Sequence, residues 1–212
     1  MTSLIVDNLR NIKEQISQAA IRRGRPADEI KLVAVVKNIP TPKILEAIEA
    51  GVKNLGESKV QDARKKFEEL PKDITWHFIG HLQTNKVKYI VKFVDLIHSV
   101  DSIELAREIS RQAEKENKVQ KVLVQVNVSG EETKFGLPAD QLINFLKEAV
   151  KLRHIAVKGL MTIAPLVEDP EKIRLIFVGL RELAKKVAQA HIKGVEMKYL
   201  SMGMTNDFRI AI

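Results

Sequence analysis

Continuous apolar runs, each followed by a helical stretch, constrain the fold of this 212-residue chain more than any other feature. The clearest run is LVAVV at 32–36, in which no polar residue alternates with the apolar ones. A strand of this kind is typically buried on both faces, as in a parallel sheet. Further strand-like segments follow at 53–57, 75–80, 95–100, 120–128, 156–162 and 197–201. Since helical patterns separate these segments, the sequence predicts βαβ units around a parallel sheet.

The segments between the predicted strands have the periodicity of amphipathic helices. A first helix is predicted over 3–23, and later ones at about 58–69, 84–92, 102–117, 138–151 and 170–191. Thr41-Pro42 and Asp169-Pro170 each place a capping residue directly before proline, which is typical of a helix start. We count seven strands, whereas eight βα units close a (β/α)₈ barrel. The sequence therefore predicts a TIM-barrel-like α/β fold whose eighth strand is missing, in one domain over 1–212.

Composition and charge exclude several classes of protein. Because the chain has no cysteine, it has no disulfides, thiolate metal sites or cysteine nucleophiles. No run approaches the ~18 apolar residues of a membrane span, and the N-terminus does not resemble a signal peptide, so we expect a soluble cytoplasmic protein. The net charge of +8 fits a small anionic ligand better than nucleic acid, because acidic and basic residues alternate along helices such as 102–117. His77 and His81 stand ~13 Å apart on a strand, so no metal site is expected.

Lys37 is the first candidate for chemistry. It directly follows the run 32–36, and ligands of parallel α/β barrels bind where the strands end. Apolar surroundings disfavour the ammonium form and leave a free amine, which attacks carbonyl groups to form Schiff bases. The alternative is a strand-end lysine that simply extends its charge into solvent.

The segment LSMGMTND at 200–207 is the second candidate. Ser201 and Thr205 supply hydroxyls, and Gly203 permits a tight turn with exposed N–H groups. Such groups, together with the N-terminus of the next helix, bind phosphate, and late βα loops are the usual phosphate site of these barrels. The alternative is an ordinary βα turn in which Thr205 caps the helix.

Other polar residues stand at or just after strand ends. Asn127 lies within an apolar strand segment and therefore needs a hydrogen-bond partner. Ser58 follows Glu57 at the end of the second predicted strand. Lys134 lies in a loop flanked by glycines, where the residues alone slightly favour simple exposure to solvent.

Seven motifs together resemble the YggS/PROSC family of pyridoxal-phosphate homeostasis proteins over nearly the whole chain. The motifs are LVAVVK (32–37), LGESKVQDA (55–63), WHFIGHLQTNK (76–86), IHSVDS (97–102), QVNVSGEETKFG (125–136), GLMTIAP (159–165) and LSMGMTNDF (200–208). The third and the last of these are the most specific. The family resembles the N-terminal barrel of alanine racemase and binds pyridoxal 5′-phosphate (PLP).

The resemblance implies that Lys37 holds PLP as an internal aldimine. It implies that the phosphate loop consists of Ser201, Gly203, Met204 and Thr205. It also matches Lys134 to a loop lysine implicated in PLP handling in bacterial relatives, and we expect Ser58 and Asn127 to contact the cofactor.

The chain departs from the family pattern at a few positions. Val36 stands where the family usually has serine before the PLP lysine, and Ser58 stands where it usually has asparagine. A second lysine of some relatives is replaced by Ile39. The family's closing strand, with an arginine near the cofactor, would lie beyond Ile212.

The resemblance leaves carriers and enzymes to be distinguished. A racemase of this barrel type needs a second domain and a second base, commonly a tyrosine, and the only tyrosines here are Tyr89 and Tyr199. We therefore expect a monomeric, non-catalytic PLP carrier that hands the cofactor to apo PLP-enzymes. The alternatives are a PLP-dependent amino-acid racemase or decarboxylase, and a PLP-free Schiff-base aldolase that uses Lys37.

Overall fold

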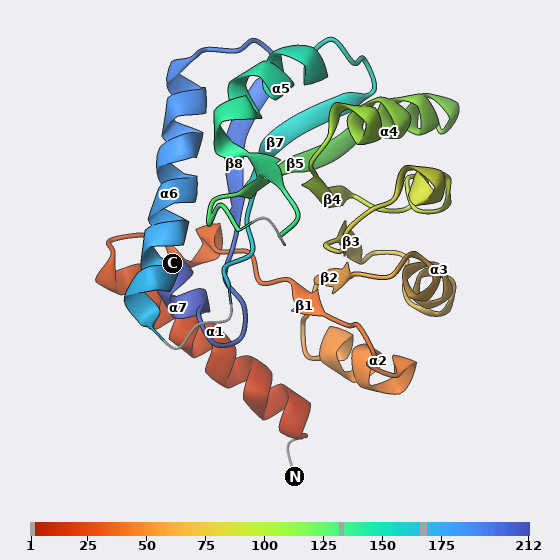
Figure 1. The fold of residues 1–212 in the computed structure, drawn as a ribbon. Helices are drawn as coiled ribbons and strands as arrows, with labels where there is room; N and C mark the ends of the chain where they lie inside the picture. The colour runs from red at the N-terminus through yellow and green to blue at the C-terminus, as the bar shows by residue number, and fades with distance from the viewer. Residues whose placement is uncertain (1–2, 132–133, 166–168) are drawn as a thin grey trace.

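The computed structural model describes residues 3–131, 134–165 and 169–212. Within these ranges, parallel strands form one sheet in the order β1-β2-β3-β4-β5-β7-β8, with the short β6 paired to β5. The strands are β1 (Ala34–Val35), β2 (Asn54–Glu57), β3 (Thr75–Phe78), β4 (Leu96–Val100), β5 (Gln120–Asn127), β6 (Leu137–Pro138), β7 (Ile155–Met161) and β8 (Val195–Ser201). Figure 1 shows the sheet bent into an arc with β1 and β8 at its two ends.

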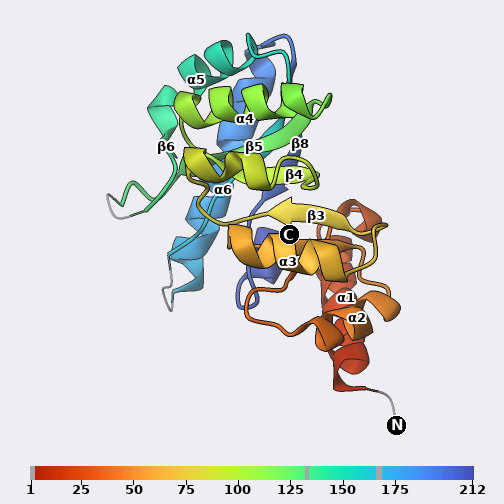
Figure 2. The same cartoon turned by 90° about the vertical axis from the view of Figure 1, so that its right-hand side faces the viewer.

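Helices surround the outside of this arc (Figures 1 and 2). The α-helices are α1 (Leu4–Arg22), α2 (Thr41–Glu49), α3 (Val60–Glu69), α4 (Ile103–Lys115), α5 (Leu142–Ala149), α6 (Pro170–Gln189) and α7 (Phe208–Ala211). The 3₁₀ helices are η1 (Ala27–Glu29), η2 (Thr84–Tyr89) and η3 (Ala139–Gln141). Helix α7 lies beside α6 and α1 and contacts both.

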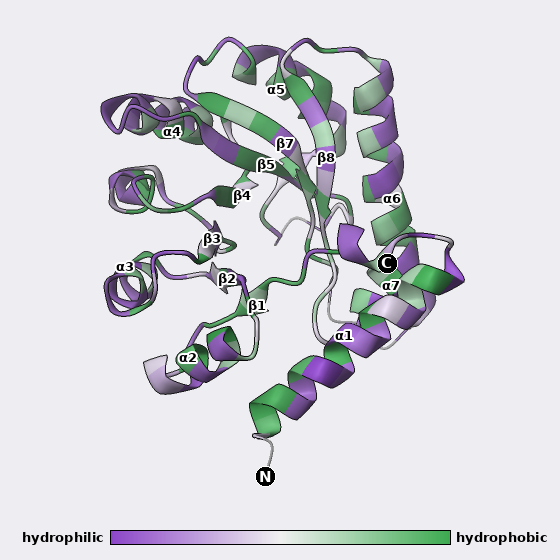
Figure 3. Cartoon of the chain, turned by 180° about the vertical axis from the view of Figure 1, so that it is seen from behind, coloured by the Kyte–Doolittle hydropathy of each residue, from purple (hydrophilic) through white to green (hydrophobic). Residues whose placement is uncertain are grey.

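Side chains along each strand point alternately toward the outer helices and toward the barrel interior. Leu55, Trp76 and Ile97 are at most 1% exposed and belong to the core between the strands and the outer helices. Helix α4 turns Leu105 and Ile109 into the same core. Figure 3 shows mostly hydrophobic residues along β7, a hydrophilic and then a hydrophobic stretch along β5, and alternating hydrophobic and hydrophilic residues along the helices. This is the pattern of buried strands covered by amphipathic helices.

The predicted fold class is confirmed: each of the seven predicted segments overlaps a strand of the main sheet order. The sequence did not predict β6, whose two residues pair with the end of β5. The run 32–36 was wrongly predicted to be a strand buried on both faces, since β1 has only two residues and Val35 is 47% exposed. The physical reason is that β1 pairs only with β2 in the described part of the chain and so forms an edge of the sheet.

Helix starts were predicted well at one site and less well at two others. Asp169 caps α6 as expected, because its side chain accepts from the backbone N–H of Glu171. Thr41 is the first residue of α2 rather than its cap, and its hydroxyl donates to Glu69 of α3. The predicted helix at 84–92 is instead the 3₁₀ helix η2.

Side chains bridge the gap between the two ends of the arc. Within the described residues no backbone pairing joins β1 to β8. The Lys31 ammonium, just before β1, lies 5.4 Å from the centre of the Tyr199 ring in β8. Arg25 also donates from Nη1 to the carbonyl of Ile212 over 3.2 Å. None of the described helices is both long enough and apolar enough to cross a bilayer.

Candidate functional site

Four of the predicted site residues follow or end strands at the same edge of the sheet. Lys37 follows β1, Ser58 follows β2, and Asn127 and Ser201 are the last residues of β5 and β8. All the paired strands are parallel, so their carboxyl ends share this edge. It is also the edge where ligands of α/β barrels bind.

Lys37 lies two residues beyond β1, in a turn, rather than at the end of a buried strand. Its side chain is exposed, and Asn38 after it has a positive φ of 59°. The expected apolar surroundings are therefore absent in the described part of the chain, because β1 is short and lies at an edge. The residue before it, Val36, is only 5% exposed and packs in the core. The structure thus anchors the backbone beside Lys37 and leaves its amine accessible.

A buried ion pair holds the ends of β1 and β2 together. Lys66 Nζ of α3 lies 2.7 Å from Glu57 Oε2 and donates to the Val36 carbonyl over 2.6 Å. The other Glu57 oxygen accepts the N–H groups of Ser58, over 2.6 Å, and Lys59, over 3.2 Å. One pair therefore positions the backbone next to both Lys37 and Ser58. Glu57 was predicted only as a polar residue at a strand end, and the role of Lys66 was not predicted, because nothing in the sequence marks one lysine of a helix as buried.

The phosphate-loop candidate begins at Ser201 and ends against α7. Gly203 has a φ of 86°, and a Cβ there would lie 2.8 Å from Ala211 Cβ, so the turn requires glycine. The Met204 N–H donates to the buried carboxylate of Asp207. Within the described residues the N–H groups of Gly203 and Thr205 donate no hydrogen bond and remain available to a ligand.

Thr205 does not cap the helix that follows the loop. Helix α7 begins at Phe208, its N-cap is Asp207, and it has only four residues. The predicted contribution of a helix N-terminus to phosphate binding is therefore small. Any phosphate bound here would depend on the hydroxyls and N–H groups of the loop.

Two buried histidines connect Ser201 to the opposite edge of the sheet. Ser201 Oγ lies 2.8 Å from His98 Nδ1, and His98 Nε2 lies 2.9 Å from His77 Nδ1. His77 Nε2 lies 3.2 Å from Asn54 Oδ1, at the start of β2. The four side chains come from β8, β4, β3 and β2, so they cross the interior of the arc. These contacts could not be predicted from the spacing of His77 and His81 along one strand, because the partner of His77 lies on the neighbouring strand.

Burial keeps both histidines neutral. Desolvation is the main cause that lowers the pKa of His77 to about 4, with Lys31 lowering and Asp95 raising it. Desolvation also lowers the pKa of His98 to about 3, and the adjacent His77 lowers it further. At neutral pH each ring therefore has one nitrogen that donates and one that accepts.

The free energy of unfolding is expected to fall as the pH drops from about 6.5 to about 4 through His77, and on to about 3 through His98. The unfolded chain protonates these histidines near pH 6.5, but the folded rings stay neutral until the pH approaches 4 and 3. Acid therefore favours unfolding, by about 1.4 kcal/mol per pH unit for each ring. Urea unfolding of wild-type and His98→Gln proteins should show a shallower pH dependence in the variant. His191→Gln, at an exposed position, should match wild type; equal slopes for all three proteins would contradict this assignment.

Asn127 and Lys134 belong to a loop that folds back on β5. The Asn127 amide donates to the Glu131 carbonyl over 2.9 Å and accepts the Gly130 N–H over 3.0 Å, so it shapes its own loop. Lys134 is exposed, and the next residue, Phe135, stacks on His81 with ring centres 4.0 Å apart. The contacts predicted for Asn127, Lys134 and Ser58 with the cofactor stay predictions.

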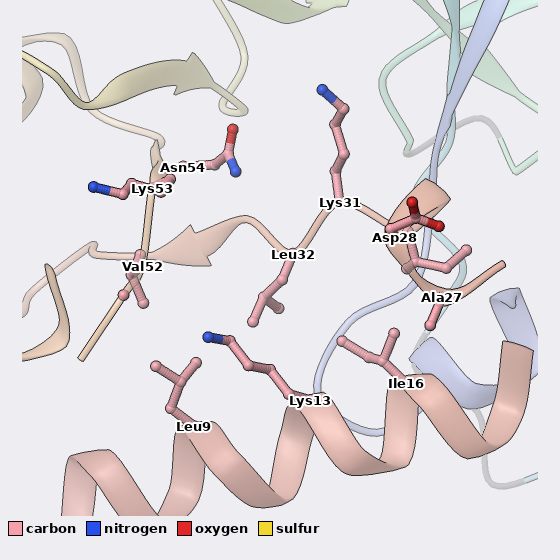
Figure 4. A pocket seen from close by; sticks show the side chains of 12 residues that line it. Leu9, Lys13, Ile16, Ala27, Asp28, Lys31, Leu32, Val52, Lys53 and Asn54 are labelled. Atoms are coloured by element: carbon pink, nitrogen blue, oxygen red, sulfur yellow. The ribbon is translucent and has the colours of Figure 1, made fainter.

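Cavities lie at both edges of the sheet. One of about 490 Å³ follows β3 and β4 at the Lys37 edge and is lined by His81 and Asp101, whose Nδ1 and Oδ2 are 3.8 Å apart. Burial raises the pKa of Asp101. Another, of about 530 Å³, lies at the opposite edge, between α1 and the starts of β1 and β2 (Figure 4). Lys31 and Asn54 both line this second cavity.

Comparisons with known proteins agree with the fold and identify the family. Residues 6–211 match the family model described as alanine racemase, N-terminal domain. The chain is 44% identical over 207 residues to the pyridoxal phosphate homeostasis protein of Aquifex aeolicus, covering 97% of this chain and 90% of that protein. The structure of PipY from Synechococcus elongatus with PLP bound superposes with a TM-score of 0.81 at 34% identity, covering 94% and 92% of the two chains. Alanine racemase from Streptomyces coelicolor shares the fold, with a TM-score of 0.70 at 16% identity over 93% of this chain and 52% of that one.

Proposed function

Because this chain belongs to the family of pyridoxal phosphate homeostasis proteins, within the alanine racemase N-terminal domain family, we propose that it binds PLP at the Lys37 edge of the sheet and carries it. The observation that most supports this proposal is that an accessible amine follows β1, while a loop with two hydroxyls and unbonded N–H groups follows β8. Those two strands are the ends of the arc, and Lys31, just before β1, contacts the Tyr199 ring of β8 across the gap. An aldehyde at Lys37 and a phosphate at the loop would span the gap.

The residues present fit PLP chemically. Lys37 supplies the only kind of side chain that forms a Schiff base with an aldehyde: its amine nitrogen bonds to the carbonyl carbon and water leaves. Ser201 and Thr205 hydroxyls and the free loop N–H groups are donors suited to a phosphate dianion. PLP supplies an electrophilic aldehyde and an electron-withdrawing ring when it is bound. The protein holds that reactive aldehyde at one end and its phosphate at the other.

Removal of both loop hydroxyls tests the phosphate half of the proposal. Ser201→Ala with Thr205→Val should weaken PLP binding, because each lost hydrogen bond to a charged group costs about 1.5–3 kcal/mol, or roughly ten- to a hundredfold in affinity. Pyridoxal, which has no phosphate, is the matched control ligand and should bind both proteins equally. PLP affinity that stays unchanged in the double variant would move the phosphate to another site.

Carriage rather than catalysis is favoured because neither of the two tyrosines, both of which lie in the described part of the chain, is placed beside Lys37. Tyr89 lies on η2, where its ring contacts Arg64 and Lys88. Tyr199 contacts Lys31, which lines the cavity at the opposite edge of the sheet. Both phenol rings therefore contact other cationic side chains, and no contact of either with Lys37 is seen among the described residues. Two-base racemisation thus has no obvious tyrosine as its second base.

Turnover separates the carrier from a racemase or decarboxylase. We expect no amino-acid turnover above roughly 0.01 per second, against about 1–10³ per second for typical enzymes. The PLP-loaded protein should instead reactivate an apo PLP-enzyme. Chiral chromatography of an amino-acid panel, run beside the reactivation assay, measures both. Complete turnover of any one amino acid that disappears with Lys37→Ala would favour the enzyme.

A cytoplasmic location and a monomeric state stay predictions.

A further inference from the structure

We propose that Asn54, His77 and His98 form a reversible hydrogen-bond chain that decides whether the Ser201 hydroxyl can donate to an anion. This inference rests on the proposed function, in which that anion is the phosphate of PLP. It makes the three side chains positioning residues for the phosphate loop, although none of them touches the ligand.

The hydrogen-bond chain is continuous from Ser201 at one end to Asn54 at the other. Its contacts run from Ser201 Oγ to His98 Nδ1 at 2.8 Å, then between the rings at 2.9 Å, and from His77 Nε2 to Asn54 Oδ1 at 3.2 Å. Both rings are buried, with exposures of 6% for His77 and 4% for His98. Since a neutral imidazole donates through one nitrogen and accepts through the other, the direction of one bond fixes the direction of all.

The position of Asn54 Oδ1 against His77 gives the hydrogen bonds one direction, in which each group donates toward Asn54. Asn54 Oδ1 can only accept, so His77 carries its proton on Nε2 and accepts at Nδ1. His98 then donates from Nε2 and accepts at Nδ1, so the Ser201 hydroxyl must donate to His98. In this direction Ser201 presents only lone pairs to the loop. A phosphate oxygen, which is an acceptor, finds no donor there.

Reversal of the chain frees the hydroxyl. If the Asn54 amide turns over, its Nδ2 donates to His77 Nε2, His77 Nδ1 donates to His98 Nε2, and His98 Nδ1 donates to Ser201 Oγ. Each ring changes tautomer, and the number of protons in the chain is unchanged. The Ser201 hydrogen then points away from His98 and can be donated to a phosphate oxygen.

The Asn54 end of the chain is built to turn over. Asn54 lines the cavity of about 530 Å³ at the opposite edge of the sheet, beside Lys31 and Lys53 (Figure 4). Within the described residues its amide nitrogen makes no hydrogen bond, so rotation breaks no other contact. Burial of the histidines also keeps them neutral, which is the condition for a chain with two directions.

Nitrogen NMR of the histidine-labelled protein tests the inference directly. Long-range proton–nitrogen correlation spectra show which ring nitrogen of His77 and His98 carries the proton. Without ligand both should be protonated at Nε2. PLP and inorganic phosphate should each move both protons to Nδ1, whereas pyridoxal should leave them at Nε2. In Ser201→Ala the phosphate-dependent change should be lost in both rings.

Rings that keep their Nε2 protons with both PLP and phosphate, or that change equally with pyridoxal, would overturn the inference. The visible absorbance of the same samples distinguishes the two levels of failure. A PLP band without a tautomer change removes the hydrogen-bond chain and leaves the proposed function intact. No band on Lys37 removes the proposed function itself.

Discussion

Replacement of Lys37 by alanine is expected to abolish the visible absorbance band of the PLP-loaded protein completely. The amine is the only group at this position that can form the covalent bond to the aldehyde, and the side chain is exposed, so its removal should leave the fold intact. Absorbance spectra of the purified variant after incubation with PLP measure the loss, and circular dichroism checks the fold.

Lys65→Ala is the matched control for this experiment. It removes another exposed lysine, on the surface of α3, and should retain the band of the wild-type protein. A normal band in Lys37→Ala, or its loss in Lys65→Ala alone, would assign the covalent bond to a different lysine.

Replacement of Lys66 by methionine should be among the most destabilising single changes in this protein. The ammonium is buried against Glu57, and its removal leaves a carboxylate that is 0% exposed without its counter-charge. Breaking one partner of a buried pair costs about 3–5 kcal/mol. Urea unfolding at neutral pH measures the change in the free energy of unfolding.

Lys65→Met provides the control on the same helix. Its ammonium is 79% exposed and lies 3.9 Å from Glu69, so its loss should cost under about 1 kcal/mol. Glu57→Gln combined with Lys66→Met should recover part of the stability, because no buried charge is then left unpaired. If Lys66→Met and Lys65→Met prove equally mild, the pair does not hold the ends of β1 and β2.

The Lys66→Met and Lys65→Met variants also test whether the buried ion pair contributes to PLP binding. Lys66 also donates to the Val36 carbonyl, and Glu57 accepts the Ser58 N–H, so the variant should bind PLP more weakly even where it remains folded. PLP titration at a temperature well below unfolding separates this effect from lost stability.

Local patterns were enough to predict the parallel sheet and the edge that carries the site. Apolar runs and helical periodicity are properties of neighbouring residues, and they located the seven strands of the main order correctly. The ends of the predicted strands then indicated Lys37 and Ser201 as candidate site residues, and this step needed no tertiary contacts. The environment of Lys37 was wrongly predicted, because its exposure depends on β1 being an edge strand with one partner.

The contacts that organise the site could not be predicted, because they join residues far apart in the sequence. His98 and Ser201 are 103 positions apart, and Lys66 reaches a carbonyl 30 positions away. A polar residue within an apolar strand indicates only that a partner exists, as for His77 and His98, and strand register decides which residue it is. In β3 and β4 that register pairs His77 with Leu96 and Phe78 with Ile97, and so brings the two rings together.

The central claim, that PLP is held covalently on Lys37, is tested most directly by borohydride reduction followed by peptide mass spectrometry. Reduction converts the Schiff base into a stable secondary amine and fixes the label on the lysine that formed it. We predict one stoichiometric label, on the peptide that contains Lys37. A label on Lys134 or on another lysine, with Lys37 unmodified, would contradict the account.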